Sequence, residues 1–295
     1  MRRSHAGVST NRPFAPWLIA LTLMWGCNWP MMKLSLREIG PLWFRAITMA
    51  GGVLLLVAWV ASRAPRLKPQ LGEGRPILNL ALPNIVIWHL FSILGLTQLP
   101  AGRAGILAFT MPVWAVVLGA LFFGAALSRR ALVASACALA AVALLSAQEW
   151  LAMTNAPWGV LWLQVAAASW ALGTQLMRRS TLSLAPEAIV VWMMAMGSVA
   201  FIALALMFEP LPQPQFWSRT MWASMAWGVV INFGISQVIW FTLARKLTPQ
   251  ASTFSMMAVP LVGVASAIAI LGERPRASDA LAAAFIVAAI AVVHG

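Results

Sequence analysis

The chain contains ten apolar runs, each long enough to cross a lipid bilayer as a helix. The runs are about 18–25 residues long, which at about 1.5 Å per helical residue matches a hydrocarbon core of about 30 Å. They occupy residues 16–33, 41–62, 76–97, 102–125, 130–148, 157–177, 186–208, 219–243, 249–271 and 277–294. This pattern predicts an all-α integral membrane protein with ten transmembrane helices.

The composition leads to the same class. Hydrophobic residues make up 61% of the chain and charged residues 9%, whereas a soluble domain carries about 25% charged residues. The segments between the runs are too short for a soluble domain or a separate catalytic module. The runs are rich in Trp, Ala and Leu without polar alternation, which argues against a transmembrane barrel.

The two halves of the chain repeat each other. An odd number of helices in each half forces the second half to cross the membrane in the opposite sense, so we expect two inverted five-helix repeats, an architecture typical of transporters. The expected units are a cytoplasmic tail at 1–15, a first repeat at 16–151 and a second at 157–295. The matching pairs are Trp25 and Trp170, Lys33 and Arg178, Pro41 and Pro186, Pro100 and Pro249, and Pro112 and Pro260.

The distribution of the basic residues sets the orientation. The formal charge of +13 could indicate nucleic-acid binding, but these charges lie in the loops of a membrane protein. Basic residues favour the cytoplasmic side, so we expect both termini in the cytoplasm and no nucleic-acid partner. No cleavage site follows the first run, which is better read as a retained helix. The cytoplasmic set is Arg2, Arg3, Arg12, Arg63, Arg66, Lys68, Arg75, Arg129, Arg130, Arg178, Arg179, Arg245 and Lys246.

Three segments resemble a known family of membrane proteins. Segment 23–29 (LMWGCNW) is similar to the first-helix signature of the drug/metabolite transporter superfamily. Segments 111–124 and 259–274 are similar to the helix four/five end of its ten-helix EamA-type exporter domain, and the closest resemblance is to bacterial aromatic amino-acid exporters. The halves differ at two matched positions: Ala125 stands where the second half has Glu273, and Ala171 where the first has Gly26.

Two prolines lie near the centres of their predicted helices. Pro112 in run 102–125 and Pro260 in run 249–271 each lack a backbone N–H and free carbonyl acceptors at the same depth. A packing kink would explain either proline alone. Because the two are repeat-related, we expect them to act as hinges beside a cavity.

Candidate substrate-binding residues are the few polar and aromatic side chains at mid-depth. His89 is the single histidine in the interior of a run, since His294 stands at the end of the last one, and a histidine at mid-depth faces an interior or a wet cavity; a neutral histidine bonded to a neighbouring helix is the alternative. The indole N–H groups of Trp25, Trp114 and Trp170 need partners that lipid does not offer, so these rings line the cavity or fill the core. Asn28, Ser92, Gln175 and Met256 complete the expected pocket, with structural hydrogen bonds as the alternative for each amide.

Other residues are expected to be structural. Arg45 and Arg103 lie near the outer ends of their runs, where snorkelling to the headgroups would explain them, with steering of carboxylates as a lesser alternative. The Ala-rich fifth and tenth helices are expected to form scaffold or dimer surfaces.

The predicted function is a secondary transporter that exports small metabolites, aromatic or other neutral amino acids, through a midplane cavity by alternating access. No Asp or Glu lies mid-span, which favours facilitated diffusion or exchange over ion coupling. The alternatives are a broad exporter of hydrophobic drugs or cations, and a non-transport scaffold or lipid scramblase. No catalytic residue, metal site or cofactor is expected; the expected partners are a small-molecule substrate and the bilayer of the inner (plasma) membrane. Monomer and dimer both remain open.

Overall fold

A computed structural model describes residues 15–63, 67–124, 126, 128–151, 156–244 and 249–294. Within these ranges it does not describe the side chains of residues 15, 131, 148–151, 156–157, 241–244, 249–257 and 293–294. The described chain contains helices and no strand. The all-α prediction is therefore confirmed for this part of the chain.

The helices form ten rods at the positions of the ten apolar runs. Seven rods are single helices: α1 (Ala15–Ser35), α2 (Pro41–Ala61), α7 (Arg129–Leu151), α8 (Ala156–Arg178), α9 (Pro186–Phe208), α12 (Pro249–Leu271) and α13 (Ala277–His294). Three rods are composite: α3 (Gly74–Ala81), η2 (Leu82–Ile87) and α4 (Trp88–Gln98) form the third, α5 (Ala101–Ala108) and α6 (Met111–Phe123) the fourth, and α10 (Arg219–Ala226), η4 (Trp227–Ile235) and α11 (Ser236–Ala244) the eighth. A short 3₁₀ turn, η3 (Pro214–Phe216), precedes α10.

The rods are long and apolar enough for a membrane protein. Among the described residues, six helical spans meet both requirements for crossing a bilayer: Pro41–Ala61, Gly74–Gln98, Ala101–Phe123, Trp158–Arg178, Pro186–Phe208 and Arg219–Trp240. Shorter apolar helices are described at Leu132–Ala147, Ala258–Leu271 and Ala277–Val292.

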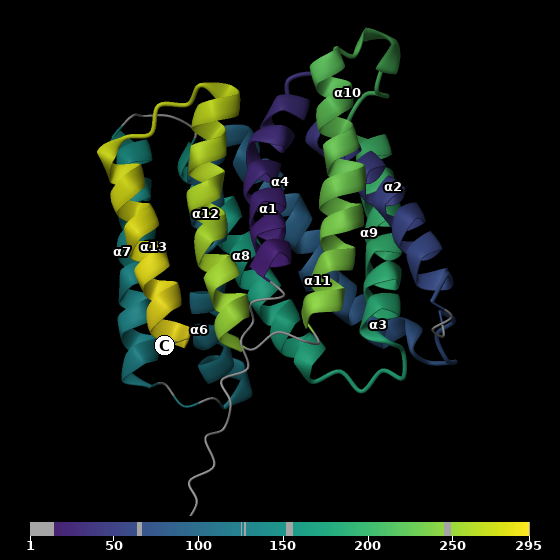
Figure 1. Cartoon of the computed structure of the whole chain (residues 1–295), viewed down its shortest axis with the longest axis horizontal. Coiled ribbons are helices and arrows are strands. Elements are labelled where there is room, and N and C mark those ends of the chain that lie inside the picture. The colour runs from purple at the N-terminus through teal and green to yellow at the C-terminus, as the bar shows by residue number, and fades with distance from the viewer. Residues whose placement is uncertain are drawn as a thin grey trace, which may run out of the picture.

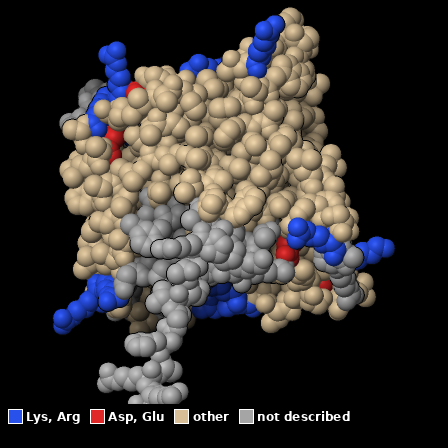
Figure 2. Space-filling view, in the orientation of Figure 1, with Lys and Arg blue, Asp and Glu red and all other residues tan. Residues whose placement is uncertain are grey.

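The rods stand side by side in one bundle with two distinct ends (Figure 1). We call the end where α12 ends and α10 begins the upper end, and the end where α13 terminates the lower end, as they are oriented in Figure 1. Figure 2 shows lysine and arginine side chains at both ends and a broad band without charges between them. Such a band is the surface that a hydrocarbon core requires.

Helices from the two halves of the chain pack in matched pairs. The second rod packs on the seventh (α2 on α9), the fifth on the tenth (α7 on α13), and the fourth on the ninth (α5 on α12). The contact of α1 with α12 has its counterpart in the contacts of α8 with α5 and α6. Many of the buried positions of α7 and α13 are alanines, including Ala134, Ala141, Ala282 and Ala289. Small residues let two backbones approach closely, which fits the packing of α7 on α13.

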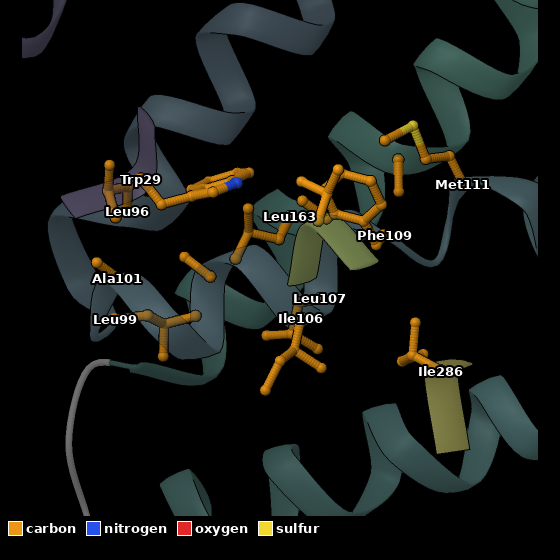
Figure 3. Packing of buried hydrophobic residues seen from close by; sticks show 14 of the residues in the cluster. Trp29, Leu96, Leu99, Ala101, Ile106, Leu107, Phe109, Met111, Leu163 and Ile286 are labelled. Carbon is orange, nitrogen blue, oxygen red and sulfur yellow. The ribbon is translucent and has the colours of Figure 1, made fainter. Parts of the chain in front are cut away.

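The largest apolar cluster lies where α1, α4, α5 and α8 meet. Figure 3 shows Trp29 of α1 with its ring directed into this cluster, near Leu96 and Leu163. The ring covers Gly105 of α5, where an added Cβ would lie 3.4 Å from Cδ1 of Trp29. Trp29 therefore fixes the distance between the first and fourth rods.

Two rods contain a π-helical segment, which the apolar pattern did not predict. The segments η2 and η4 begin at Leu82 and Trp227, which are 145 positions apart, as are Trp25 and Trp170. A proline at the start of η2, Pro83, has no N–H to donate, and its carbonyl accepts a hydrogen bond from Ser169 Oγ of α8 at 2.5 Å. π-helical segments are rare and occur mostly at functional sites.

The fourth rod is broken rather than kinked. We expected one helix over 102–125 with its kink at Pro112, but α5 ends at Ala108 and α6 begins at Met111. Pro112 occupies the first turn of α6, where its missing N–H costs no helical bond. Pro260, in contrast, lies inside the continuous helix α12. Pro112 and Pro260, which the sequence comparison of the halves had paired, thus occupy different local structures.

Candidate functional site

An interior group of aromatic and polar side chains surrounds α4. We call it the central group and define it as Arg45 of α2, Trp88, His89 and Ser92 of α4, Trp170 of α8, and Phe233 of η4. The ring centroids of Trp88 and Trp170 are 5.2 Å apart, and those of His89 and Phe233 are 5.3 Å apart. Four rods, two from each half of the chain, therefore contribute to one cluster.

His89 is buried within this group. Its side chain is 8% exposed, and its Nδ1 atom has no hydrogen-bond partner among the described residues. The expectation that His89 faces the interior is correct. In the alternative, a neighbouring helix would form hydrogen bonds with the ring. No described residue does so at Nδ1. A buried polar atom without a partner is uncommon and costly, which marks this position as a candidate binding site.

Arg45 is the residue whose position differs most from the expectation. It does not snorkel, because its side chain is 2% exposed. Its Nη2 atom donates to Ser92 Oγ at 3.2 Å, while its Nε has no partner among the described residues. Arg45 occupies the face of α2 that packs inside the bundle, so the helix carries the guanidinium away from the lipid.

A second polar group forms hydrogen bonds on both sides of the break between α5 and α6. Gln164 of α8 accepts hydrogen bonds through Oε1 from Trp114 Nε1 at 3.0 Å and from Thr110 Oγ1 at 3.1 Å. Its Nε2 donates to the carbonyl of Leu107 at 3.4 Å. The partly buried indole of Trp114 thus has the partner that its depth requires. The sequence analysis missed Gln164, although an amide within an apolar run could have drawn attention to it.

The other predicted site residues lie apart from the central group. Trp25 contacts Trp240 of α11, with centroids 5.5 Å apart, and Asn28 is half-buried in α1. Gln175 lies in the last turn of α8, where it donates to the carbonyl of Ala115 at 3.2 Å. The side chain of Met256 lies outside the described residues. The structure therefore unites His89, Ser92 and Trp170 in the central group, whereas Trp114 and Gln175 form hydrogen bonds with other partners.

At the upper end, three carboxylates bind the N-terminal ends of helices in the opposite half of the chain. We call Glu38, Glu209 and Glu273 the upper-end caps. Glu273 accepts the N–H groups of Ala101 at 2.6 Å and Gly102 at 3.0 Å, the first two residues of α5. A carboxylate here satisfies N–H groups that have no helical partner and complements the positive end of the helix dipole.

The other two caps act in the same way on other helices. Glu209 accepts the N–H groups of Leu42 at 2.9 Å and Trp43 at 3.0 Å, at the start of α2. Glu38 accepts from the N–H of Ser218 at 2.7 Å, and Ser218 is the N-cap of α10. The hydrogen bonds of Glu38 to Ser218, mainly from its hydroxyl and then from its N–H, hold the pKa of this carboxyl below its usual value.

Charged side chains add further connections at this end. Arg103 of α5 forms a buried ion pair with Asp279 of α13, with Nη2 2.8 Å from Oδ1. Lys33 of α1 donates to the carbonyls of Leu96 at 2.6 Å and Leu99 at 2.9 Å. The snorkelling expectation is therefore wrong for Arg103 too, because a carboxylate partner inside the protein replaces the headgroups. Beside this pair lies a hollow of about 270 Å³, which Glu273 also lines.

Comparisons with known proteins agree with a membrane transporter. The sequence model of the EamA-like transporter family matches residues 13–147 and again residues 157–295. The chain is 29% identical to the uncharacterized transporter YvbV of Bacillus subtilis (strain 168), over 94% of this chain and 90% of YvbV. It is 26% identical to the uncharacterized inner membrane transporter YedA of Escherichia coli (strain K12), over 94% of this chain and 89% of YedA.

Two further likenesses concern function and fold. A protein of Escherichia coli (strain K12) named as a probable amino-acid metabolite efflux pump is 25% identical, over 91% of this chain and 90% of its own. A solved structure described only as "Crystal structure of protein" matches with a TM-score of 0.68 and 19% identity, over 95% of this chain and 96% of that one. At this identity the solved structure supports the fold alone.

Proposed function

Because the chain belongs to the EamA-like transporter family, a family of membrane transporters and not of enzymes, we propose that it is a secondary transporter that exports aromatic and other neutral amino acids. It is a multi-pass protein of the inner membrane. The observation that carries the cargo proposal is the central group, in which Trp88 contacts Trp170 and Phe233 contacts the buried ring of His89. An apolar pocket with few oriented polar groups suits a small molecule with an aromatic body and a polar head.

We propose that residues 16–151 and 157–295 are inverted repeats and that both termini face the cytoplasm. The separate matches of the family to 13–147 and 157–295, the pairing of α2 with α9 and α7 with α13, and the equivalent π-helical segments support the repeat. The excess of basic residues in the loops of the lower end supports the orientation. In this orientation, the upper-end caps close the outer side.

The proposed mechanism is alternating access about the central group. Release outward requires the upper-end caps to separate from the helices that they bind, because each cap joins the two halves of the chain. The irregular segments η2 and η4 and the break before Pro112 supply bends at which rods can move, and Pro260 supplies a second hinge. The absence of a mid-span carboxylate favours facilitated diffusion or exchange.

The composition of the central group argues against the alternative of a cation exporter. A cationic drug would meet the buried guanidinium of Arg45, and like charges at close range repel strongly where water is excluded. A lipid scramblase would need no saturable pocket at all. The cargo experiment separates these alternatives from amino-acid export.

The test is uptake of labelled phenylalanine and tryptophan into proteoliposomes that contain the purified chain. We expect saturable uptake that unlabelled aromatic and aliphatic amino acids block and cationic dyes do not. Trp170→Ala should reduce this uptake, whereas Trp17→Ala should not, because Trp17 is 55% exposed at the bundle surface. Uptake no faster than in empty vesicles would show that the amino-acid cargo is wrong, and block by dyes alone would transfer the function to drug export.

A further inference from the structure

We infer that Arg45 binds the carboxylate of the cargo, so that the chain selects aromatic acids and amino acids over the corresponding amides and amines. This inference rests on the proposed transport function and adds a residue that recognises one chemical group. It starts from the contrast between the two buried arginines. Arg103 has a carboxylate partner, Asp279, at 2.8 Å, whereas Arg45 has, within the described part of the chain, a single hydrogen bond, to a neutral hydroxyl.

The burial of Arg45 makes the missing partner significant. Its side chain is 2% exposed and its Nε is unsatisfied among the described residues. A guanidinium has five N–H donors and stays protonated in proteins. A buried charge is normally paired, and an ionisable residue within a membrane helix marks a functional site with a partner to be named. A bound carboxylate would supply that partner.

The fold itself does not require a cation at this position. Arg45 lies five residues after Gly40, the N-cap of α2. At a separation of 145 positions, the second half of the chain has Val190, on α9. The second and seventh rods pack on each other and occupy matched positions in the bundle. Since an apolar residue serves at the matched position, the arginine adds something other than packing.

The surroundings of Arg45 fit an aromatic acid. Ser92, its hydrogen-bond partner, is three residues from His89, so both lie on one face of α4. Next to His89 lie the rings of Trp88 and Phe233, and Trp170 contacts Trp88. A cargo with its ring among these side chains could place its carboxylate at the guanidinium, whose planar fork binds carboxylates through two parallel hydrogen bonds.

The position also suits a transport cycle. Glu209 binds the N–H groups of Leu42 and Trp43, at most three residues before Arg45 on the same helix. A carboxylate bound to Arg45 would therefore act on the part of α2 that the upper-end cap holds. Cargo binding and closure of the upper end would share one helical turn.

The first experiment measures competition against labelled phenylalanine in proteoliposomes. The competitors are phenylalanine, 3-phenylpropionate, which keeps the carboxylate, and phenylalaninamide, which keeps the ammonium. We expect the two carboxylates to compete at concentrations at least about tenfold lower than the amide, as for a lost charged hydrogen bond. Arg45→Met should abolish this preference, and Arg45→Lys should restore part of it. Equal competition by the amide in the wild-type chain, or an unchanged preference in Arg45→Met, would overturn the inference.

The second experiment needs no cargo and so separates this inference from the proposed function. Thermal unfolding of the full chain in detergent is compared for Arg45→Met and Arg103→Met. We expect Arg103→Met to lower the melting temperature, because Asp279 loses its partner, and Arg45→Met to leave it unchanged or raise it. A fall for Arg45→Met as large as that for Arg103→Met would give Arg45 a structural role. Absence of any phenylalanine uptake by the wild-type chain, with this stability contrast intact, would instead refute the amino-acid cargo.

Discussion

The bond between Glu273 and the start of α5 offers a direct test of closure at the upper end. Glu273→Ala removes the acceptor of two backbone hydrogen bonds, from Ala101 at 2.6 Å and Gly102 at 3.0 Å. A capping carboxylate that binds two N–H groups contributes about 2 kcal/mol. Since the bonds join the two halves, that free energy favours the state closed at the upper end. At about 1.4 kcal/mol per tenfold, its loss raises the open population about 30-fold.

The population of the state open at the upper end can be measured from the labelling rate of one buried cysteine. Ala104 of α5 is fully buried in this structure, so Ala104→Cys reports opening once Cys27 and Cys137 are replaced by alanine. With a membrane-impermeant maleimide, we expect Glu273→Ala to label about 30-fold faster than its parent. Glu273→Gln, which keeps the shape without the charge, should fall between the two.

A carboxylate at the lower end provides the matched control. Glu73 accepts the N–H of Ser183 at 2.7 Å, so Glu73→Ala removes a comparable bond away from the upper end. It should not raise labelling at position 104. Labelling of Glu273→Ala within twofold of its parent would refute the view that this cap holds the upper end closed. If Glu73→Ala accelerated labelling at position 104 equally, the cysteine would report a general loosening of the bundle and not opening of the upper end.

Four further outcomes follow from single contacts. Gly26→Val should lower the melting temperature, because a Cβ at residue 26 would lie 2.6 Å from Val262 Cβ and 3.1 Å from the backbone N of Gly263; Gly74→Ala, with nothing within 4 Å, is its control. Trp114→Phe should destabilise the chain by about 1 kcal/mol in denaturant or thermal unfolding, since it removes the hydrogen bond to Gln164, and an unchanged stability would contradict a role for this bond. Asp279→Asn should cost about 3 kcal/mol, because Arg103 stays buried without an anion, and a neutral result in thermal unfolding would contradict the pairing. The pKa of Glu38 is lowered on folding, so its stabilising contribution is present above the pKa of the unfolded chain and is lost as pH falls through the folded pKa; the difference in melting temperature between wild type and Glu38→Gln should therefore vanish in strong acid, and a difference that grows there would reverse the sign.

The number and limits of the rods could be predicted from the sequence because they depend on local composition. A run of apolar residues must bond its own backbone groups in lipid and therefore forms a helix. Its length is set by the bilayer, so the ten runs correspond to the ten rods of the structure within a few residues at most ends. The alanines of α7 and α13 likewise indicated close packing, which the structure contains.

The irregular parts of the rods could not be predicted from the sequence. Pro112 indicated a disturbance in the fourth rod, but α5 ends at Ala108, four residues earlier, and Gln164 of another rod accepts hydrogen bonds from Thr110 and Trp114 at the break. The π-helical segments depend in the same way on neighbours, as with the bond from Ser169 to Pro83. A partner that lies far away in the chain leaves no periodic signal.

The candidate site, too, could be predicted from the sequence only in part. By itself the sequence determined which residues are unusual for a membrane helix, and His89, Ser92 and Trp170 were among those selected; it also determined the class of protein, since composition and span length allow few others. Only the tertiary structure decided that Arg45 turns into the bundle, and that Glu38, Glu209 and Glu273 bind helices of the other half. The physical reason is that depth along a rod follows from residue number, whereas the direction of a side chain around the rod and the partner it meets follow from how the rods pack.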